Sequence, residues 1–330
     1  MVYVDKNKGT GSLKIGLIGC GRVAENHLLA VSKCQGAEVI VAGGGSSASD
    51  FCRRHGLELA SPQEIIERED IDAILVLTPH TSHYEYAMTA MDKGKHVLIE
   101  KPVSFDLAEM KSMKDLARSR SVVCFPGHSY LYSQDMMRMI AAAHDGTLGQ
   151  IAFLFTTETY YMEEQLFVRY EGPQVDILCH HLYMMLALVG MPQSVSAVTT
   201  SYPASVVPTE GPQIGILIKT RGNTIVTTFL SWAVDDHTST PFTHFVKILG
   251  TGGALQFNRR DFVLNKEDGG YEQPIYQEMF DNQMKYFIYD CIMGGKDPLS
   301  TIEDAERVLH IHQDIMQAVR TGATVPVEEV

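Results

Sequence analysis

Residues 75–83 read Leu-Val-Leu-Thr-Pro-His-Thr-Ser-His, Tyr84–Lys93 follow at helical spacing, and residues 94–102 read Gly-Lys-His-Val-Leu-Ile-Glu-Lys-Pro. This order predicts strand, loop, helix, strand and loop. The apolar runs Ile74–Leu77 and His96–Ile99 are short and bounded by Pro or Gly, which is typical of strands buried on both faces of a parallel sheet. Ligands of open α/β sheets bind outside the carboxyl ends of the strands. The polar residues expected at this rim are Thr78, His80, Glu100 and Lys101.

A glycine motif lies at an earlier junction between a strand and a helix. Leu13–Ile18 is a short apolar strand, and Gly-Cys-Gly-Arg-Val-Ala at 19–24 leads into a helix expected to end near Ser32. In a GxGxxA motif the first Gly permits a tight turn, the second lets a pyrophosphate approach the backbone, and the Ala allows close helix packing. The phosphates would lie at the helix N-terminus, where free N–H groups favour anions. Dinucleotide binding is favoured over a purely structural turn, with contacts from Gly19, Gly21, Arg22 and Val23.

The end of the second strand, Glu38–Ala42, bears on which dinucleotide binds. An acidic residue is expected there in order to hold the ribose hydroxyls of NAD. The chain instead continues Gly-Gly-Gly-Ser-Ser at 43–47, and no carboxylate appears before Asp50. Ser46, Ser47 and the glycine backbone could donate to a 2′-phosphate, so the prediction is NAD or NADP with a weak preference for NADP. The alternative is a flexible loop that does not discriminate between NAD and NADP.

Strands and helices alternate with short links as far as Gly127, which predicts an α/β fold with an N-terminal doubly wound parallel sheet of the Rossmann type. Ser61 and Glu64 fit a capping box with Pro62 at the first helical position. Other elements expected in this part are the strand Ile71–Leu77, the helix Ser104–Arg118 and the strand Val122–Phe125.

Beyond about Gln134 the pattern changes to long alternating strands, which predicts a C-terminal α+β domain with a large, mostly antiparallel open sheet. Arg221-Gly-Asn223 is a hairpin turn signal. The strands expected are Ile151–Thr159, Ser194–Tyr202, Gln213–Thr220, Thr224–Ser231 and Thr243–Leu249, and the helices are Gln134–His144, Gln174–Leu188, Tyr276–Met293 and Thr301–Val319. The predicted organisation is a flexible tail at 1–12, a dinucleotide-binding domain at 13–127 and a substrate-binding and oligomerisation domain at 128–330.

Composition excludes several functional classes. At 330 residues two domains are the default. The formal net charge of -13 argues against a nucleic-acid surface. No apolar run reaches the roughly 18 residues that span a bilayer, and the polar N-terminus lacks a secretory core, so no membrane association and a cytoplasmic protein are expected. The six cysteines are scattered without CxxC or Cys/His ligand spacing, so neither a disulfide framework nor a metal site is expected.

The predicted helices cover one face of the predicted antiparallel sheet, so its other face must be buried against something else. Strand residues such as Phe229, Trp232 and Phe245 could supply an apolar surface for another copy of the chain. We therefore expect a homo-oligomer, a dimer or tetramer, formed through the C-terminal sheet.

With these pieces assembled, the chain resembles the glucose-fructose oxidoreductase and inositol dehydrogenase (Gfo/Idh/MocA) family. The resemblance covers nearly everything from Leu13 to about Gly322. Its most specific part is Glu-Lys-Pro at 100–102 preceded by Gly-Lys-His-Val. The other matching segments are Gly19–Ala24 with His27 downstream, Thr78–His83, Gly172–His180 and Gly250–Ala254.

The resemblance implies a catalytic set. In this family the Lys of Glu-Lys-Pro works with an Asp and a His spaced DxxxH, which fall here on Lys101, Asp176 and His180. Independently, residues four apart share a helix face, so Asp176 and His180 can point into one site. Tyr183 lies on the same face where the family often has Asp, and Leu131 stands where an Arg often follows the Gly-His segment, so the substrate class is left open.

Each candidate has a plainer interpretation. His180 could be a buried helix histidine satisfied by Asp176, and His181 is expected to be structural. His83 is expected to order the loop beneath the cofactor. The cofactor contacts expected around that loop are Thr78, Pro79, His80, His83, Glu100 and Lys101, and the substrate contacts are Lys101, Asp176, His180 and Tyr183.

The hypothesis from sequence is an NAD(P)-dependent oxidoreductase that moves a hydride between the nicotinamide and a carbinol carbon of a sugar, cyclitol or related polyhydroxylated substrate. His180 would take the hydroxyl proton, Lys101 would stabilise charge on the same oxygen, and Asp176 would orient substrate and imidazole. Two alternatives remain: an enzyme that uses bound NAD transiently for elimination or glycoside cleavage, and a regulator without catalysis that senses the dinucleotide. Retention of all three residues counts against the regulator.

Overall fold

The computed structural model describes residues 12–162, 164, 167, 170–201, 211–233, 243–259, 264–265, 271–272 and 274–328. The chain divides into two compact units, each built from two stretches of sequence. The first is Met1–Ser133 with Gln277–Glu306, and the second is Gln134–Tyr276 with Arg307–Val330. The predicted tail, apart from Ser12, lies outside the described residues.

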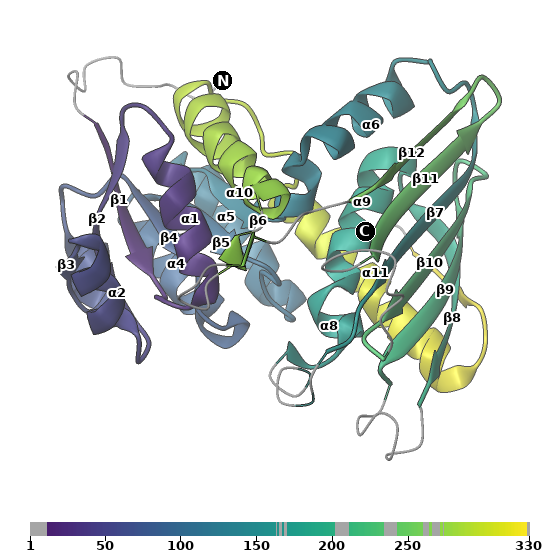
Figure 1. The fold of residues 1–330 in the computed structure, drawn as a ribbon, viewed down its shortest axis with the longest axis horizontal. Coiled ribbons are helices and arrows are strands. Elements are labelled where there is room, and N and C mark those ends of the chain that lie inside the picture. The colour runs from purple at the N-terminus through teal and green to yellow at the C-terminus, as the bar shows by residue number, and fades with distance from the viewer. Residues whose placement is uncertain are drawn as a thin grey trace. The chain divides into compact units, whose positions relative to one another are not determined.

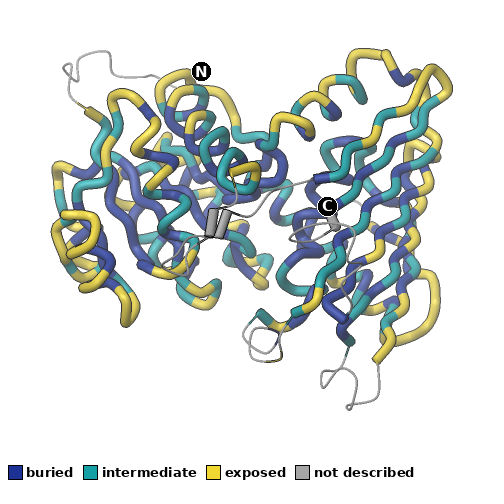
Figure 2. The backbone as a smooth tube through the Cα atoms, viewed as in Figure 1, coloured by how far each residue is buried: buried dark blue, intermediate teal, exposed yellow. Residues whose placement is uncertain are grey.

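The first unit contains a six-stranded sheet in the order β3-β2-β1-β4-β5-β6, and every neighbouring pair is parallel (Figure 1). The predicted parallel sheet is confirmed. Its interior strands β1, β4 and β5 are dark blue in Figure 2, because their central residues are buried on both faces. The strands are β1 Leu13–Ile18, β2 Ala37–Gly43, β3 Glu58–Leu59, β4 Ala73–Val76, β5 His96–Glu100 and β6 Cys124–Gly127.

The strand order places a topological switch point at β1. The chain runs from β1 to β2 and β3 on one side, and then returns to β4, β5 and β6 on the other. Right-handed crossovers in opposite directions put their helices on opposite faces of the sheet, and the crevice between the carboxyl ends of β1 and β4 is where such folds bind ligands. The crossover helices are α1 Arg22–Ser32, α2 Ala48–His55, α3 Pro62–Glu67, α4 His83–Asp92 and α5 Leu107–Arg120.

Local capping explains where two of these helices begin. At α3 the predicted capping box is confirmed: the Ser61 hydroxyl accepts the Glu64 N–H, and the Glu64 carboxylate accepts the Ser61 N–H. The helix expected from Ser104 begins instead at Leu107, because the Asp106 carboxylate caps the first turn by accepting the N–H groups of Ala108 and Glu109.

A late segment of the chain returns to the first unit. There α10 (Pro274–Lys285) packs against α1, with an edge contact between His27 and Phe280 and a Lys33–Asp281 ion pair of 2.6 Å. The π-helical stretch Tyr286–Met293 follows and packs against β6. The predicted division at residue 128 differs from the compact units in this respect, because these contacts join residues about 250 positions apart.

The second unit contains a seven-stranded sheet in the order β12-β11-β7-β10-β9-β8-β15. All neighbouring pairs are antiparallel except β7 and β10, so the predicted sheet is confirmed as mixed and mostly antiparallel. The predicted hairpin at 221–223 joins β9 to β10, with Asn223 at φ 62°. The strands are β7 Ile151–Thr159, β8 Pro192–Thr200, β9 Gln213–Thr220, β10 Ile225–Ser231, β11 Thr243–Gly250, β12 Ala254–Asn258 and β15 Val325–Pro326, with a separate pair β13 Leu264–Asn265 and β14 Tyr271–Glu272.

Burial alternates along these strands, as Figure 2 shows. Leu154, Thr156 and Glu158 of β7 are buried, and α9 packs against this strand and β10. The residues between them are only partly covered, so the two faces of the sheet differ. The expectation that Trp232 supplies an apolar surface for another copy of the chain is wrong, because its side chain is fully buried. The helices of this unit are α6 Gln134–His144, α8 Pro173–Asp176, α9 Leu178–Val189 and most of α11 Ile302–Thr321.

The single helix predicted over Gln174–Leu188 is wrong in one respect. Gly172 is the N-cap residue and Pro173 the first residue of α8, but α8 ends at Asp176 and α9 begins at Leu178, with Ile177 between them at φ -106°. The break falls between Asp176 and His180, so their spacing of four does not guarantee a shared helix face. All six cysteines are buried free thiols, and no described helix is long and apolar enough to cross a bilayer.

Candidate functional site

The loop after β1 adopts a backbone that requires its first glycine. Gly19 has φ +106°, and a Cβ there would lie 2.6 Å from the Leu77 carbonyl carbon. Its N–H donates to the Gly43 carbonyl at 2.8 Å, and the Cys20 N–H donates to the Gly44 carbonyl at 3.1 Å. The turn is therefore held against the ends of both β2 and β4, at the switch point of the sheet.

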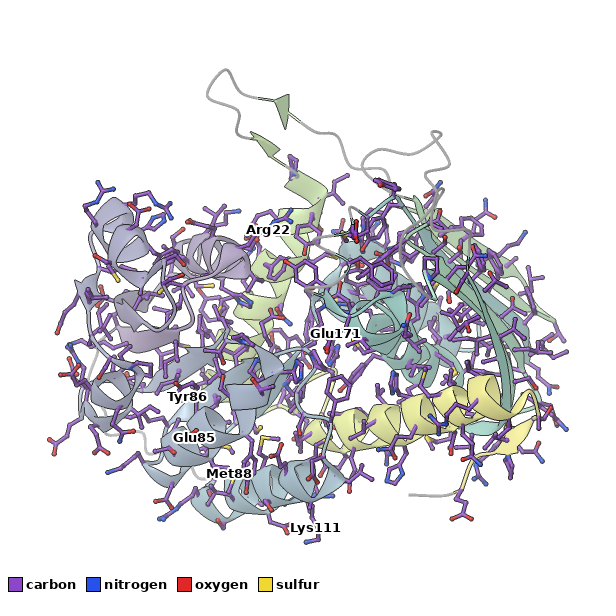
Figure 3. All side chains as sticks on the ribbon, turned by 90° about the horizontal axis from the view of Figure 1, so that it is seen from below. Arg22, Glu85, Tyr86, Met88, Lys111 and Glu171 are labelled. Atoms are coloured by element: carbon purple, nitrogen blue, oxygen red, sulfur yellow. The ribbon has the colours of Figure 1, made fainter. Side chains whose placement is uncertain are left out.

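The second glycine of the motif faces open space. Gly21 is the N-cap residue of α1, it is exposed, and a Cβ there would meet no atom within 4 Å. Arg22, the first residue of α1, is exposed at the surface (Figure 3). Among the described residues no side chain caps α1, and an uncapped helix N-terminus favours anions. The residues predicted to contact a dinucleotide, Gly19, Gly21, Arg22 and Val23, all lie in this turn and at the start of α1.

One carboxylate lies in the first turn of α1, where it would repel phosphate. Glu25 is paired there with Arg54 at 2.7 Å and with His55 at 2.8 Å, both from α2. The Arg54 guanidinium offsets the charge of Glu25, which lowers the repulsion that an anion would meet at this helix N-terminus.

The loop after β2 is built from glycine and serine, as the sequence indicates. Gly44 and Gly45 both have φ +85°. Both serines are exposed, but the Ser47 hydroxyl donates to the Cys20 carbonyl at 2.7 Å. Ser47 therefore ties this loop to the glycine motif, and Ser46 is the more available hydroxyl for a ligand.

His83 joins the loops that follow β4 and β5. Its Nε2 lies 2.7 Å from the Thr78 carbonyl and its Nδ1 lies 3.0 Å from the Pro102 carbonyl. Burial lowers the pKa of His83 below its ordinary value, although both carbonyl contacts act in the opposite direction. A neutral imidazole carries one N–H group, so the His83 ring donates to one of these two carbonyls at a time. This placement suits the ordering role predicted for His83, with Pro79 and His80 on the loop between.

Glu100 links Lys101 to the glycine-motif helix. One carboxylate oxygen lies 2.7 Å from His27 Nε2, and the other accepts the Lys101 N–H at 3.1 Å. Burial raises the pKa of Glu100, but the His27 hydrogen bond and the nearby positive charges outweigh it, so the net pKa is below the ordinary value. The pair is 73 residues apart in sequence, and the sequence analysis named His27 only as part of the family resemblance, without a partner.

His128, directly after β6, is a further residue near Lys101. Burial, followed by the charge of Lys101, holds its pKa well below the ordinary value. The Gln283 side-chain oxygen accepts the backbone N–H groups of His128 and Ser129 at 3.1 and 3.2 Å. No local sequence pattern predicts this contact, because Gln283 is far along the chain from His128.

The rim of the first unit therefore gathers most of the predicted residues. The strands β1, β4 and β5 are consecutive in the sheet, so their carboxyl ends bring the glycine loop, the Thr78–His83 segment and Lys101 to one edge. Lys101 is half-buried and precedes a cis Lys101–Pro102 peptide bond.

The second unit holds Asp176, His180 and Tyr183. Asp176 ends α8 and is half-buried, whereas His180 and Tyr183 lie on α9 and are buried. The exposed Glu171, with φ 59°, precedes the Gly172 turn that starts α8 (Figure 3). His312 of α11 lies 3.0 Å from the Gln174 carbonyl, which ties α8 to the C-terminal helix.

His181, expected to be structural, belongs to a buried polar cluster. Its Nε2 lies 3.3 Å from a Glu158 carboxylate oxygen, and its ring centroid is 5.6 Å from that of His244. One ligand-type atom of each residue lies within 4.8 Å of the others, and all three are buried. The sequence offered no spacing signal, because the three residues come from β7, α9 and β11.

Comparisons with known proteins agree with this geometry. The profile described as "Oxidoreductase family, NAD-binding Rossmann fold" matches residues 13–128, and "Oxidoreductase family, C-terminal alpha/beta domain" matches residues 170–327. The chain is 22% identical over 340 residues to scyllo-inositol 2-dehydrogenase (NAD(+)) of Bacillus subtilis, covering 96% of each chain. An uncharacterized oxidoreductase of Streptococcus pneumoniae is 23% identical over 56% of this chain, which spans about half (52%) of that relative's length.

Solved structures show the same fold. The scyllo-inositol dehydrogenase from Lactobacillus casei with bound cofactor NAD(H) and scyllo-inositol superposes with a TM-score of 0.82 at 19% identity, covering 96% of this chain and 99% of that one. With both domain profiles matched in order, over the parallel sheet with its glycine loop and over the mixed sheet with its covering helices, the chain belongs to the Gfo/Idh/MocA oxidoreductase family.

Proposed function

We propose that this protein is an NAD(P)-dependent oxidoreductase acting on a CH–OH group of a sugar, cyclitol or related polyol. The observation that carries the proposal is the rim of the first unit, where the open Gly21 turn and Lys101 lie at one edge of a parallel sheet. A bound nicotinamide supplies hydride transfer. The inositol dehydrogenases among the similar proteins support the polyol class.

In the proposed reaction the chain handles the proton and the developing charge. His180 takes the hydroxyl proton, because the ordinary pKa of imidazole lies near the working pH. Lys101 donates a hydrogen bond to the same oxygen and stabilises its negative charge. Asp176 orients the substrate and the imidazole, and Tyr183 contacts the substrate where relatives often carry Asp.

The choice of dinucleotide follows from the loop after β2. No carboxylate lies among residues 43–47, so a 2′-phosphate meets no repulsion there, and this favours NADPH. The hydroxyl of Ser47 is already engaged by Cys20, which leaves Ser46 and backbone N–H groups as donors. Separate fluorescence titrations with NADH and NADPH test this choice. Tighter NADPH binding that Ser46→Ala weakens is expected, and equal affinity for both would contradict it.

Turnover is tested by screening polyols and sugars, beginning with scyllo-inositol and myo-inositol, while following reduced-cofactor absorbance. Accumulation of reduced cofactor with a polyol supports the proposal. Product without reduced cofactor indicates transient oxidation during elimination or glycoside cleavage. Dinucleotide binding with no turnover, together with a co-purifying partner protein, indicates a sensing regulator.

We further propose that the open face of the second unit's sheet binds another copy of the chain. Its exposed apolar side chains are Val198, Leu217, Ile225 and Phe229, which come from three adjacent strands. Leu217→Lys is expected to reduce the mass measured by light scattering to that of a smaller assembly, while the circular dichroism spectrum is unchanged. A wild-type protein that is monomeric at micromolar concentration would overturn this proposal.

A further inference from the structure

The first turn of α9 carries His180 but has little local support. The helix is separated from α8 at Ile177, and none of the described side chains caps its N-terminus. The His180 N–H bonds to the Ile177 carbonyl at 3.1 Å, a contact within the turn itself. First-turn N–H groups without a cap fray readily. The orientation of this turn therefore depends on what its other side chains contact.

The next residue along the helix supplies a directional contact to the sheet. His181 Nε2 donates to the carboxylate of Glu158 on β7 at 3.3 Å, and its ring packs edge-on against His244 of β11 at 72°. The side chains of His181 and Glu158 are 0% and 2% exposed. Because consecutive helical residues point about 100° apart, fixing His181 against the sheet also fixes the direction of His180.

We propose that Glu158 and His181 are positioning residues that hold the first turn of α9 in register on the sheet and so orient His180. That these two residues fix the first turn of α9 follows from the contacts above, and the effect on catalysis rests on the proposed function. Apolar neighbours such as Leu178 and Leu182 also bury this turn, but apolar packing is non-directional. A buried carboxylate bonded to an imidazole restricts rotation and sliding more strictly, since the bond weakens steeply away from its preferred geometry.

Glu158 and His181 form, together with His244, a set of three residues that could bind a divalent cation. The position of Arg259 favours a hydrogen-bonded Glu158–His181 pair over a cation site at this cluster. Arg259 is buried, its N–H donates to the His244 carbonyl at 2.8 Å, and with burial its charge holds the pKa of His244 well below the ordinary value. A cation at the cluster would face this guanidinium.

Four variants and one matched control test the proposal. His181→Phe keeps a ring without the bond, His181→Gln retains an amide donor near the position of Nε2, and Glu158→Gln retains an acceptor without charge. The double variant Glu158→Leu with His181→Phe replaces both partners, which limits the stability loss from an unpaired buried group. The control, Thr156→Val, removes the 2.8 Å Thr156–Thr228 hydrogen bond from the same strand and face.

The first readout is hydrogen–deuterium exchange of the amides of residues 181–184. His181→Phe and the double variant are expected to exchange about tenfold faster there, Glu158→Gln and His181→Gln less so, and Thr156→Val at the wild-type rate. Wild-type exchange in both His181→Phe and the double variant, or equal acceleration in Thr156→Val, would overturn the proposal. So would stoichiometric zinc in purified wild-type protein that His181→Phe loses, because the residues would then be ligands.

The second readout is steady-state kinetics on a polyol that the screen identifies. A positioning role lowers kcat about tenfold in His181→Phe with KM and NAD(P)H affinity kept, and His181→Gln restores part of it. Wild-type kcat in folded His181→Phe would reject the catalytic consequence. If the wild type turns over no polyol, the proposed function fails, and the exchange data still decide the positional part.

Discussion

The cofactor side and the acid/base side of the proposed site are built in different ways. In the first unit, the glycine loop, the Thr78–His83 segment and Lys101 each directly follow a strand, and parallel pairing brings them together. In the second unit, α8 and α9 are held by contacts distant in sequence: His181 with Glu158, 23 residues apart, and His312 with Gln174, 138 apart. The positions of side chains that follow strand ends can be predicted from local sequence. The positions of side chains held by contacts distant in sequence cannot.

The sharpest test of this comparison is Lys101→Ala. Loss of the group proposed to stabilise the substrate oxygen should lower turnover by about 10² to 10⁴ while dinucleotide affinity is kept. Steady-state kinetics and NAD(P)H titration measure the two separately. Lys111→Ala is the control, because this exposed lysine pairs only with Asp115 on its own helix among the interactions described for it and should be silent. Near-normal turnover in Lys101→Ala would remove Lys101 from the mechanism.

Substitutions of the two motif glycines should affect different properties, the free energy of unfolding at Gly19 and dinucleotide affinity at Gly21. Gly19→Ala forces a Cβ against the Leu77 backbone at positive φ, and we expect a loss of about 2 to 5 kcal/mol in the free energy of unfolding. Gly21→Ala meets no protein atom, so its urea midpoint should equal that of wild type while its dinucleotide Kd rises about tenfold. Unchanged affinity in Gly21→Ala would place the pyrophosphate elsewhere.

The distant pair in the first unit, His27 and Glu100, should give a pH-dependent effect. The pKa of Glu100 in the folded protein lies below its ordinary value of 4.5, so its ionised form stabilises the fold above that pH and the contribution is lost as pH falls through the folded pKa. Glu100→Gln should cost about 1.5 to 3 kcal/mol at pH 7. Urea unfolding of both proteins from pH 7 to pH 3 should show the difference shrinking below about 4.5. A constant difference would reject the assignment.

The smallest effect is expected at the capping box of α3, which is formed by residues close together in sequence. Ser61→Ala removes one half of the capping box of α3, and we expect a loss of about 1 kcal/mol in the free energy of unfolding. Ser119→Ala, whose hydroxyl donates only to the Leu116 carbonyl one turn earlier among the contacts described for it, should stay within about 0.5 kcal/mol of wild type. Equal effects in both variants would show that the capping box adds nothing.

The sequence by itself determined the sheet types, most element bounds and the residues at the strand ends. Apolar runs and the glycine motif are local signals, because a strand and the turn after it are encoded within a few residues. The motif glycines, the capping box at Ser61 and the hairpin at 221–223 are accordingly where they were predicted.

Only the tertiary structure decided the break at Ile177, the return of residues 277–306 to the first unit, and the pairs of His27 with Glu100 and of His181 with Glu158. The physical reason is that a buried ionisable side chain takes its partner from whichever element packs against it. That element is chosen by packing across the whole unit, and no spacing along the chain records the choice.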